Sequence, residues 1–144
     1  MNLLKMALCI LWLFPSFLTA KQNNFTDADL NAYLSKNPKG IIYIVSPHMY
    51  LSLKGLEEYE KIAATQKLPF LVLVDPMATT NKNMLNIDLS KYAKLDSKDI
   101  ISRDSTQHYP SYIFYKNGKL EGGFNPGYDA PEKFTERLNR YFRE

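Results

Sequence analysis

The fold is decided by residues 41–52, which read Ile-Ile-Tyr-Ile-Val-Ser-Pro-His-Met-Tyr-Leu-Ser. Residues 41–45 form a continuous run of β-branched and aromatic side chains, which is typical of a strand buried on both faces. The run breaks at Pro47, and a helix is expected to follow. In a small α/β domain, ligands usually bind where such a strand ends and the next helix begins. The question of function therefore lies in this stretch.

Two further elements are predicted on its C-terminal side. Apolar residues recur at helical spacing over residues 52–66, which predicts an amphipathic helix lying on a sheet, with Ser52 as its cap. Residues 70–74 form a second buried apolar run. That run ends at Asp75-Pro76, where Asp75 is interpreted as a turn residue. Since a helix separates the two strands, they can pair in parallel.

Helix signals also occur at both ends of the domain and in its middle. Thr26 and Asp29 have the spacing of a capping box, which predicts an N-terminal helix. Residues 84–95 carry apolar side chains at helical spacing and favour another helix. Asp129, followed three residues later by Glu132, indicates the start of a final helix.

A hairpin is predicted in the last third of the chain. The pattern of residues 111–116 predicts a strand. Asn117-Gly118 follows, and residues 119–124 are the expected partner strand. Asn-Gly between two such runs is the strongest short-range signal for a β-hairpin.

The N-terminal segment has the pattern of a secretory signal peptide. A short, positively charged start precedes an apolar run, and Leu18-Thr19-Ala20 offers a cleavage site. The run contains Pro15 and is shorter than the ~20 residues that a membrane-spanning helix needs. We therefore expect a signal peptide at residues 1–20 and one domain at residues 21–144. We also expect export to the periplasm or the cell exterior, without stable membrane insertion after signal removal.

Charge and cysteine content exclude several functions. The chain has 18 basic and 15 acidic residues, a net charge of +3, and both signs are interspersed. Without a basic stripe, no nucleic-acid partner is expected. The single cysteine, Cys9, lies within the predicted signal peptide. The exported domain would therefore lack thiol chemistry, whether redox, nucleophilic or metal-binding.

The order of these elements, together with three local motifs, resembles the thioredoxin-like superfamily over most of residues 21–144. The motifs are the buried strand that leads through a proline-containing loop into a long helix, the proline of Tyr109-Pro110 before a strand, and the Lys116-Asn117-Gly118 turn. The resemblance implies an α/β fold with a central mixed sheet of about four strands flanked by helices. It also implies a cis proline at Pro110.

The chain departs from that family at the residues that carry its chemistry. Aligned on the long helix, the two cysteines of the Cys-x-x-Cys motif fall on Met49 and Ser52, and the buried acid falls on Tyr43. Dithiol exchange needs both sulfurs, so a redox-inactive member is expected. No hydrolase or phosphate-binding motif is present in the sequence either, and no enzymatic activity is expected.

The resemblance still implies a binding surface, formed by the loop before the long helix and by residues 107–110. In the family this surface receives an extended peptide, whose backbone pairs with the residue before the cis proline, here Tyr109. Main-chain pairing of this kind needs no cysteine. We therefore expect a polypeptide partner, although Tyr50 and Tyr109 can also be packing residues. The candidate binding residues are His48, Met49, Tyr50, Leu51, Ser52, Tyr109 and Pro110.

The two histidines suggest an alternative function. His48 lies before the long helix and His108 lies two residues before Pro110, so the resemblance brings them to one face, where Met49 adds a thioether. Two imidazoles and a thioether suit copper, and two imidazoles with a water could hold zinc. A third strong ligand is not evident, so both histidines can equally be ordinary loop residues. No other cofactor is expected.

Overall fold

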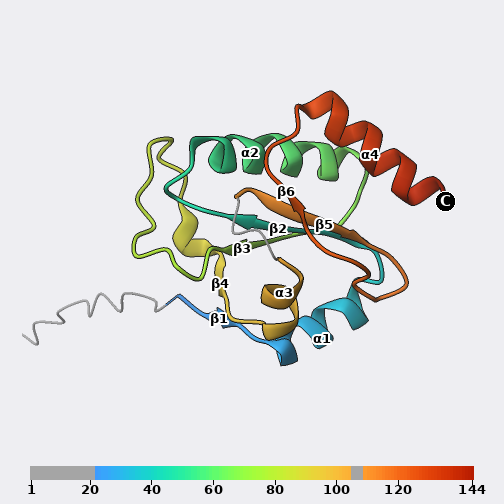
Figure 1. Cartoon of the computed structure of the whole chain (residues 1–144), viewed down its shortest axis with the longest axis horizontal. Helices are drawn as coiled ribbons and strands as arrows, with labels where there is room; N and C mark the ends of the chain where they lie inside the picture. The colour runs from blue at the N-terminus through green and yellow to red at the C-terminus, as the bar shows by residue number, and fades with distance from the viewer. Residues whose placement is uncertain (1–21, 105–108) are drawn as a thin grey trace, which may run out of the picture.

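A sheet with helices on both faces forms the body of the molecule (Figure 1). The computed structural model describes residues 22–104 and 109–144, and the predicted signal peptide at residues 1–20 lies outside them. Helices α2 and α4 cover one face of the sheet, and α1 and α3 cover the other. In chain order the elements are β1 (Asn24–Phe25), α1 (Asp27–Lys36), β2 (Gly40–Val45), α2 (Tyr50–Thr65), β3 (Phe70–Val74), the 3-10 helix η1 (Leu89–Lys91), β4 (Ala93–Leu95), α3 (Lys98–Arg103), β5 (Ser111–Tyr115), β6 (Asn125–Pro126) and α4 (Pro131–Arg143).

Strand β2 lies inside the sheet, whose strand order is β1-β4-β3-β2-β5-β6. It pairs in parallel with β3 and antiparallel with β5, and all six of its residues are buried. Side chains alternate along a strand, so Tyr43 packs in the core under α2 and α4, whereas Ile42 and Ile44 pack toward α1 and α3. The prediction of a strand buried on both faces is confirmed.

The start of α1 also follows the prediction from sequence. The Asp29 carboxylate accepts a hydrogen bond of 2.8 Å from the main-chain N–H of Thr26, and the Thr26 hydroxyl oxygen accepts one of 3.4 Å from the N–H of Asp29. This capping box satisfies donors that the first turn of a helix leaves free.

Two predictions are wrong, one about the number of strands in the sheet and one about residues 84–95. The sheet has six strands, not about four, because β1, β4 and β6 hold only two or three residues each and leave no pattern in the sequence. Residues 84–95 do not form a helix but contain η1 and β4. Strand β4 pairs in parallel with both β1 and β3, so the sheet determines the conformation of residues 93–95 and overrides their helical spacing.

The predicted hairpin is formed only at its turn. Asn117 and Gly118 both have positive φ angles, of 57° and 65°, as the tightest hairpin turns require. The predicted partner strand at residues 119–124 is largely absent, since its only pairing within the described residues is a bridge between Lys116 and Lys119. The segment instead leaves β5 for the end of α3, where the N–H of Phe124 donates to the main-chain oxygen of Arg103.

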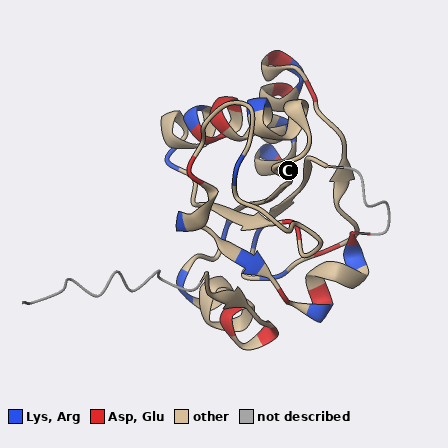
Figure 2. Cartoon of the chain, turned by 90° about the vertical axis from the view of Figure 1, so that its left-hand side faces the viewer, with Lys and Arg blue, Asp and Glu red and all other residues tan. Residues whose placement is uncertain are grey.

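Acidic and basic residues are interspersed over the helices and loops (Figure 2). Four of the five ion pairs within the described residues join side chains four positions apart in the sequence, which is typical of solvated surfaces. Among residues 22–104 and 109–144, no helix combines the length and the apolar character needed to cross a membrane.

Candidate functional site

Two hollows meet at the carboxyl ends of β2 and β3, where α2 begins. The first, here called the Tyr128 hollow, has a volume of about 690 Å³ and extends toward the segment after β6. The second, the Asp75 hollow, has a volume of about 630 Å³ and extends toward the end of α3. Both are lined by His48, Met49 and Tyr109. Segments far apart in the chain therefore build one continuous surface.

Three consecutive side chains are exposed where the loop after β2 meets the start of α2. Helix α2 begins at Tyr50, with Met49 in the cap position and no side-chain hydrogen bond to the cap. The side chains of Met49, Tyr50 and Leu51 are 39%, 48% and 46% exposed. All three line the Tyr128 hollow. Exposed large apolar side chains that are contiguous in this way are typical of interaction sites.

Ser52 corrects two predictions. It is the third residue of α2, not its cap, and its side chain is fully buried. Its hydroxyl oxygen accepts a hydrogen bond of 2.8 Å from the main-chain N–H of Ser46, and its main-chain oxygen accepts one of 2.6 Å from the Tyr43 hydroxyl. Ser52 lines neither hollow, so it supports the loop from beneath and is not available to a ligand.

The peptide bond between Tyr109 and Pro110 is cis, the geometry that the resemblance implies at this position. Pro110 is buried and lines neither hollow; its main-chain oxygen accepts a hydrogen bond of 2.7 Å from the N–H of Gly127. Tyr109 is half-buried between the hollows. Within the described parts of the chain, its main-chain N–H and C=O have no hydrogen-bond partner.

The Asp75 hollow contains two acidic side chains. Asp75 is only 6% exposed, and its carboxylate accepts a hydrogen bond of 2.8 Å from the N–H of Met77, so the predicted turn role is confirmed. Burial raises the pKa of Asp104, and the charge of Asp75 raises it further, while the Ser111 hydroxyl opposes the shift. Burial, followed by the charges of Asp75 and Asp104, also raises the pKa of Tyr109.

The far wall of the Tyr128 hollow is fixed by Tyr59. The Tyr59 hydroxyl donates to the main-chain oxygen of Asp129 at 2.6 Å and accepts from its N–H at 2.7 Å. Tyr128 stacks on Tyr59, and its hydroxyl donates to Glu58 at 2.6 Å. Burial, together with the Glu58 carboxylate, raises the pKa of Tyr128 to about 12. This wall is therefore ordered by packing and hydrogen bonds.

Only part of the metal site predicted from the sequence lies within the described residues. His48 and Met49 line the same two hollows, but His108 lies outside the described residues. Among residues 22–104 and 109–144, no group of three or more His, Cys, Asp and Glu side chains is placed to hold a metal ion. The pairing of the two histidines therefore remains a prediction.

Several residues of the surface were missed from the sequence. Met77, Ile101 and Asp104 line the Asp75 hollow, and Tyr128 lines the other. Asp75, which was interpreted only as a turn residue, also lines the Asp75 hollow, and its signal was its place directly after a buried strand whose carboxyl end adjoins the site. Met77 comes from the turn after β3, Ile101 from α3, Asp104 from the C-terminal cap of α3 and Tyr128 from the segment between β6 and α4, and no element had been predicted at these positions.

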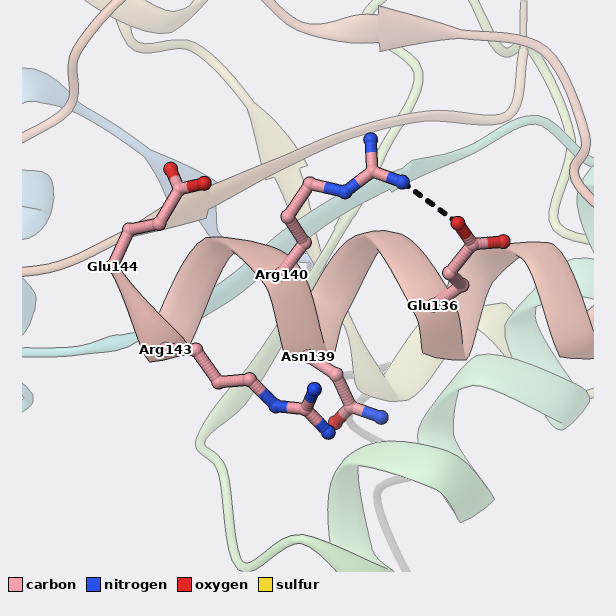
Figure 3. Close-up of a pocket in the computed structure, with 5 residues that line it drawn as sticks. All are labelled: Glu136, Asn139, Arg140, Arg143 and Glu144. Carbon is pink, nitrogen blue, oxygen red and sulfur yellow. Dashed lines mark hydrogen bonds and ion pairs between the residues drawn. The ribbon is translucent and has the colours of Figure 1, made fainter.

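A further hollow on α4 differs in kind from this surface. Figure 3 shows its lining side chains on one helix, with Arg140 directed toward Glu136. Their ion pair spans 2.7 Å, and both side chains are about two-thirds exposed. Charged groups that already pair with each other in water gain little from a ligand. The candidate site is therefore the surface formed by the two hollows around Tyr109.

Comparison with known proteins supports the fold. No family model and no curated protein sequence matches this chain. Its structure is similar to the crystal structure of the pneumococcal exposed lipoprotein thioredoxin Etrx1 from Streptococcus pneumoniae strain TIGR4, with a TM-score of 0.50 and 18% identity. The match covers 74% of this chain and 89% of that chain. The chain therefore has a thioredoxin-like fold, as predicted. With one cysteine in the whole sequence, it cannot form the intramolecular disulfide of dithiol exchange.

Proposed function

We propose that this protein is an exported, non-catalytic thioredoxin-like module that binds an extended polypeptide. The binding surface consists of His48, Met49, Tyr50, Leu51 and Tyr109. The observation that carries the proposal is the position of Tyr109, whose main-chain N–H and C=O lie without partners in the described chain between the two hollows. An extended peptide can pair with those groups and place its side chains in the hollows.

The residues around Tyr109 suit a binding role. Tyrosine side chains offer a large contact area for a small loss of conformational freedom, and Tyr50 and Tyr128 contribute such area. Ser52 and Pro110 would act indirectly, because they hold the loop and the segment after β6 through hydrogen bonds. The similar solved protein is an exposed lipoprotein. Together with the signal-peptide pattern at residues 1–20, this supports export.

Selection from a displayed library of random decapeptides tests this proposal. Peptides that bind the protein should be enriched, and calorimetry should give one site per chain. Met49→Ser should weaken a selected peptide about tenfold, since it removes apolar contact area. Met84→Ser is the matched control, because Met84 is 63% exposed and lines neither hollow. Failure to enrich any peptide, or equal weakening by both variants, would contradict the proposal.

Metal binding is a second candidate function. It is favoured by the presence of His48 with the thioethers of Met49 and Met77 around one hollow, a donor set that suits copper. Anaerobic titration with Cu(I), Cu(II) and Zn(II), beside a His48→Ala, His108→Ala variant, tests it. One equivalent of metal that this variant no longer binds would support the alternative, and unchanged binding would oppose it.

A further inference from the structure

The Asp75 hollow has apolar walls near its mouth. Met77 is 81% exposed and Ile101 is 44% exposed, and both line the hollow together with Met49, Pro76 and Leu95. Walls of this kind favour an alkyl chain, because contact with it removes apolar surface from water. A lysine or arginine side chain has such an alkyl stem and carries its charge at the far end.

The acidic groups of the hollow have no cationic partner in the described chain. Asp75 and Asp104 take part in none of the ion pairs among residues 22–104 and 109–144, and none of the described residues that line the hollow is Lys or Arg. One oxygen of Asp104 is buried and has no hydrogen-bond partner among these residues. Asp75 is buried, and its carboxylate accepts a hydrogen bond only from the neutral main-chain N–H of Met77 among the described residues. A buried carboxylate without a cationic partner is costly, so a cation from outside would be stabilised beside it.

Asp129 provides an internal comparison, because its carboxylate pairs with basic side chains of the same chain. Its oxygens contact Lys133 at 2.9 Å and Arg137 at 3.4 Å, and they also accept a hydrogen bond from Tyr112 at 2.6 Å. Asp75 is buried and Asp104 is partly exposed; both line a hollow whose described lining contains no Lys or Arg. The charge of Asp129 is therefore balanced within the chain, whereas no described residue that lines the hollow balances the charges of Asp75 and Asp104.

We propose that the Asp75 hollow accepts a lysine or arginine side chain of the bound polypeptide, an inference that rests on the peptide-binding function proposed above. A strand that pairs with Tyr109 passes beside the hollow, since Tyr109 forms part of its lining. The alkyl stem of the basic residue lies along Met77 and Ile101, and its cation reaches Asp75 and Asp104. The chemical class of the partner is therefore an extended peptide with a basic residue opposite Tyr109.

The composition of the selected decapeptides tests this inference separately from the binding function. Peptides selected on the protein should be enriched in Lys or Arg at one position. Replacing that residue by norleucine, which keeps the stem and removes the charge, should weaken binding about tenfold. Asp104→Asn should abolish the difference between the two peptides. Asp96→Asn, which makes the same charge change at an exposed position that does not line the hollow, should preserve it.

The outcomes separate the two proposals. If peptides are selected without enrichment of basic residues, or if the norleucine peptide binds equally well, the binding function stands and the assignment of the Asp75 hollow is wrong. If Asp96→Asn and Asp104→Asn reduce the preference equally, the attraction comes from net charge and not from the hollow, which also overturns the assignment. If no peptide is selected, both proposals fail.

Discussion

The hydroxyl oxygen of Ser52 accepts a hydrogen bond of 2.8 Å from the main-chain N–H of Ser46. This contact joins the loop after β2 to the first turn of α2 and is fully buried. The loop residues His48 and Met49 lie between Ser46 and Ser52, so their position on the candidate surface depends on a fully buried contact.

Removal of this contact should destabilise the protein. Ser52→Ala leaves the N–H of Ser46 buried without its partner, which costs about 1–3 kcal/mol. Urea unfolding should show the lower free energy of unfolding. Ser35→Ala serves as the control, because Ser35 is exposed on α1 and its substitution should change stability by less than about 0.5 kcal/mol. Equal stability of both variants would show that the Ser46–Ser52 contact has no net effect.

Two substitutions should introduce a disulfide at the start of α2. Met49 is the cap of α2 and Ser52 is its third residue, the spacing of the motif found in redox-active relatives of the fold. In a Cys9→Ser background, Met49→Cys with Ser52→Cys should form an intramolecular disulfide under mild oxidation, since such bonds need Cα atoms ~4.4–6.8 Å apart. Alkylation and mass spectrometry measure the free thiols. A pair that remains reduced would refute the alignment on which the redox-inactive interpretation rests.

Gly55 should resist replacement by alanine, although alanine normally favours a helix by about 1 kcal/mol. A Cβ atom at position 55 would lie 2.6 Å from the hydroxyl oxygen of Tyr43. Gly55→Ala should therefore lower the free energy of unfolding. Combined with Tyr43→Phe, which removes that oxygen, it should cost less than the two single effects together. Strict additivity in this double-mutant cycle would contradict the proposed clash.

Asp104→Asn should stabilise the protein near neutral pH. The pKa of Asp104 is raised in the folded state by burial and by Asp75, so folding disfavours the charged carboxylate and stability is lost as the pH rises through that pKa. The variant removes this penalty, and because solvent screens a partly exposed group the gain should stay below about 1 kcal/mol. Urea midpoints should differ at pH 7 and converge as the pH falls toward 4. A difference that grows on acidification would contradict this assignment.

The same substitution should also reduce the preference of the Asp75 hollow for a basic side chain. Stability and binding would then respond to Asp104→Asn in opposite directions. This is the pattern expected of a residue retained for function at a cost in stability.

The fold was predictable where local chemistry and tertiary structure agree. The run Ile41–Val45 is apolar at every position and lies inside the sheet, and Thr26 caps α1 as its spacing indicates. The segment before β4 is instead organised by a polar side chain, because the Asn83 side chain accepts hydrogen bonds from the N–H groups of Leu85 and Ile87. A polar side chain that organises a loop in this way leaves no periodic pattern in the sequence.

The candidate site was predictable only in part, for a similar reason. Met49, Tyr50 and Leu51 adjoin the central strand in sequence, and Tyr109 precedes a proline, so local signals identified all four. Asp104 reaches the same surface only because α3 packs under the sheet beside Ile42 and Ile44. Contacts that depend on the placement of a six-residue helix are decided by packing, which a single sequence does not display.

The two outermost strands of the sheet limit how copies of the protein can associate in concentrated solution. Strands β1 and β6 are each two residues long, and Pro126 in β6 has no N–H to donate. A neighbouring molecule therefore meets very few free main-chain groups along β1 and β6 themselves, so copies of the protein gain little by pairing with either of these strands. A molecule with an exposed apolar surface beside α2 is thus protected against one route to polymerisation by the shortness of its outermost strands.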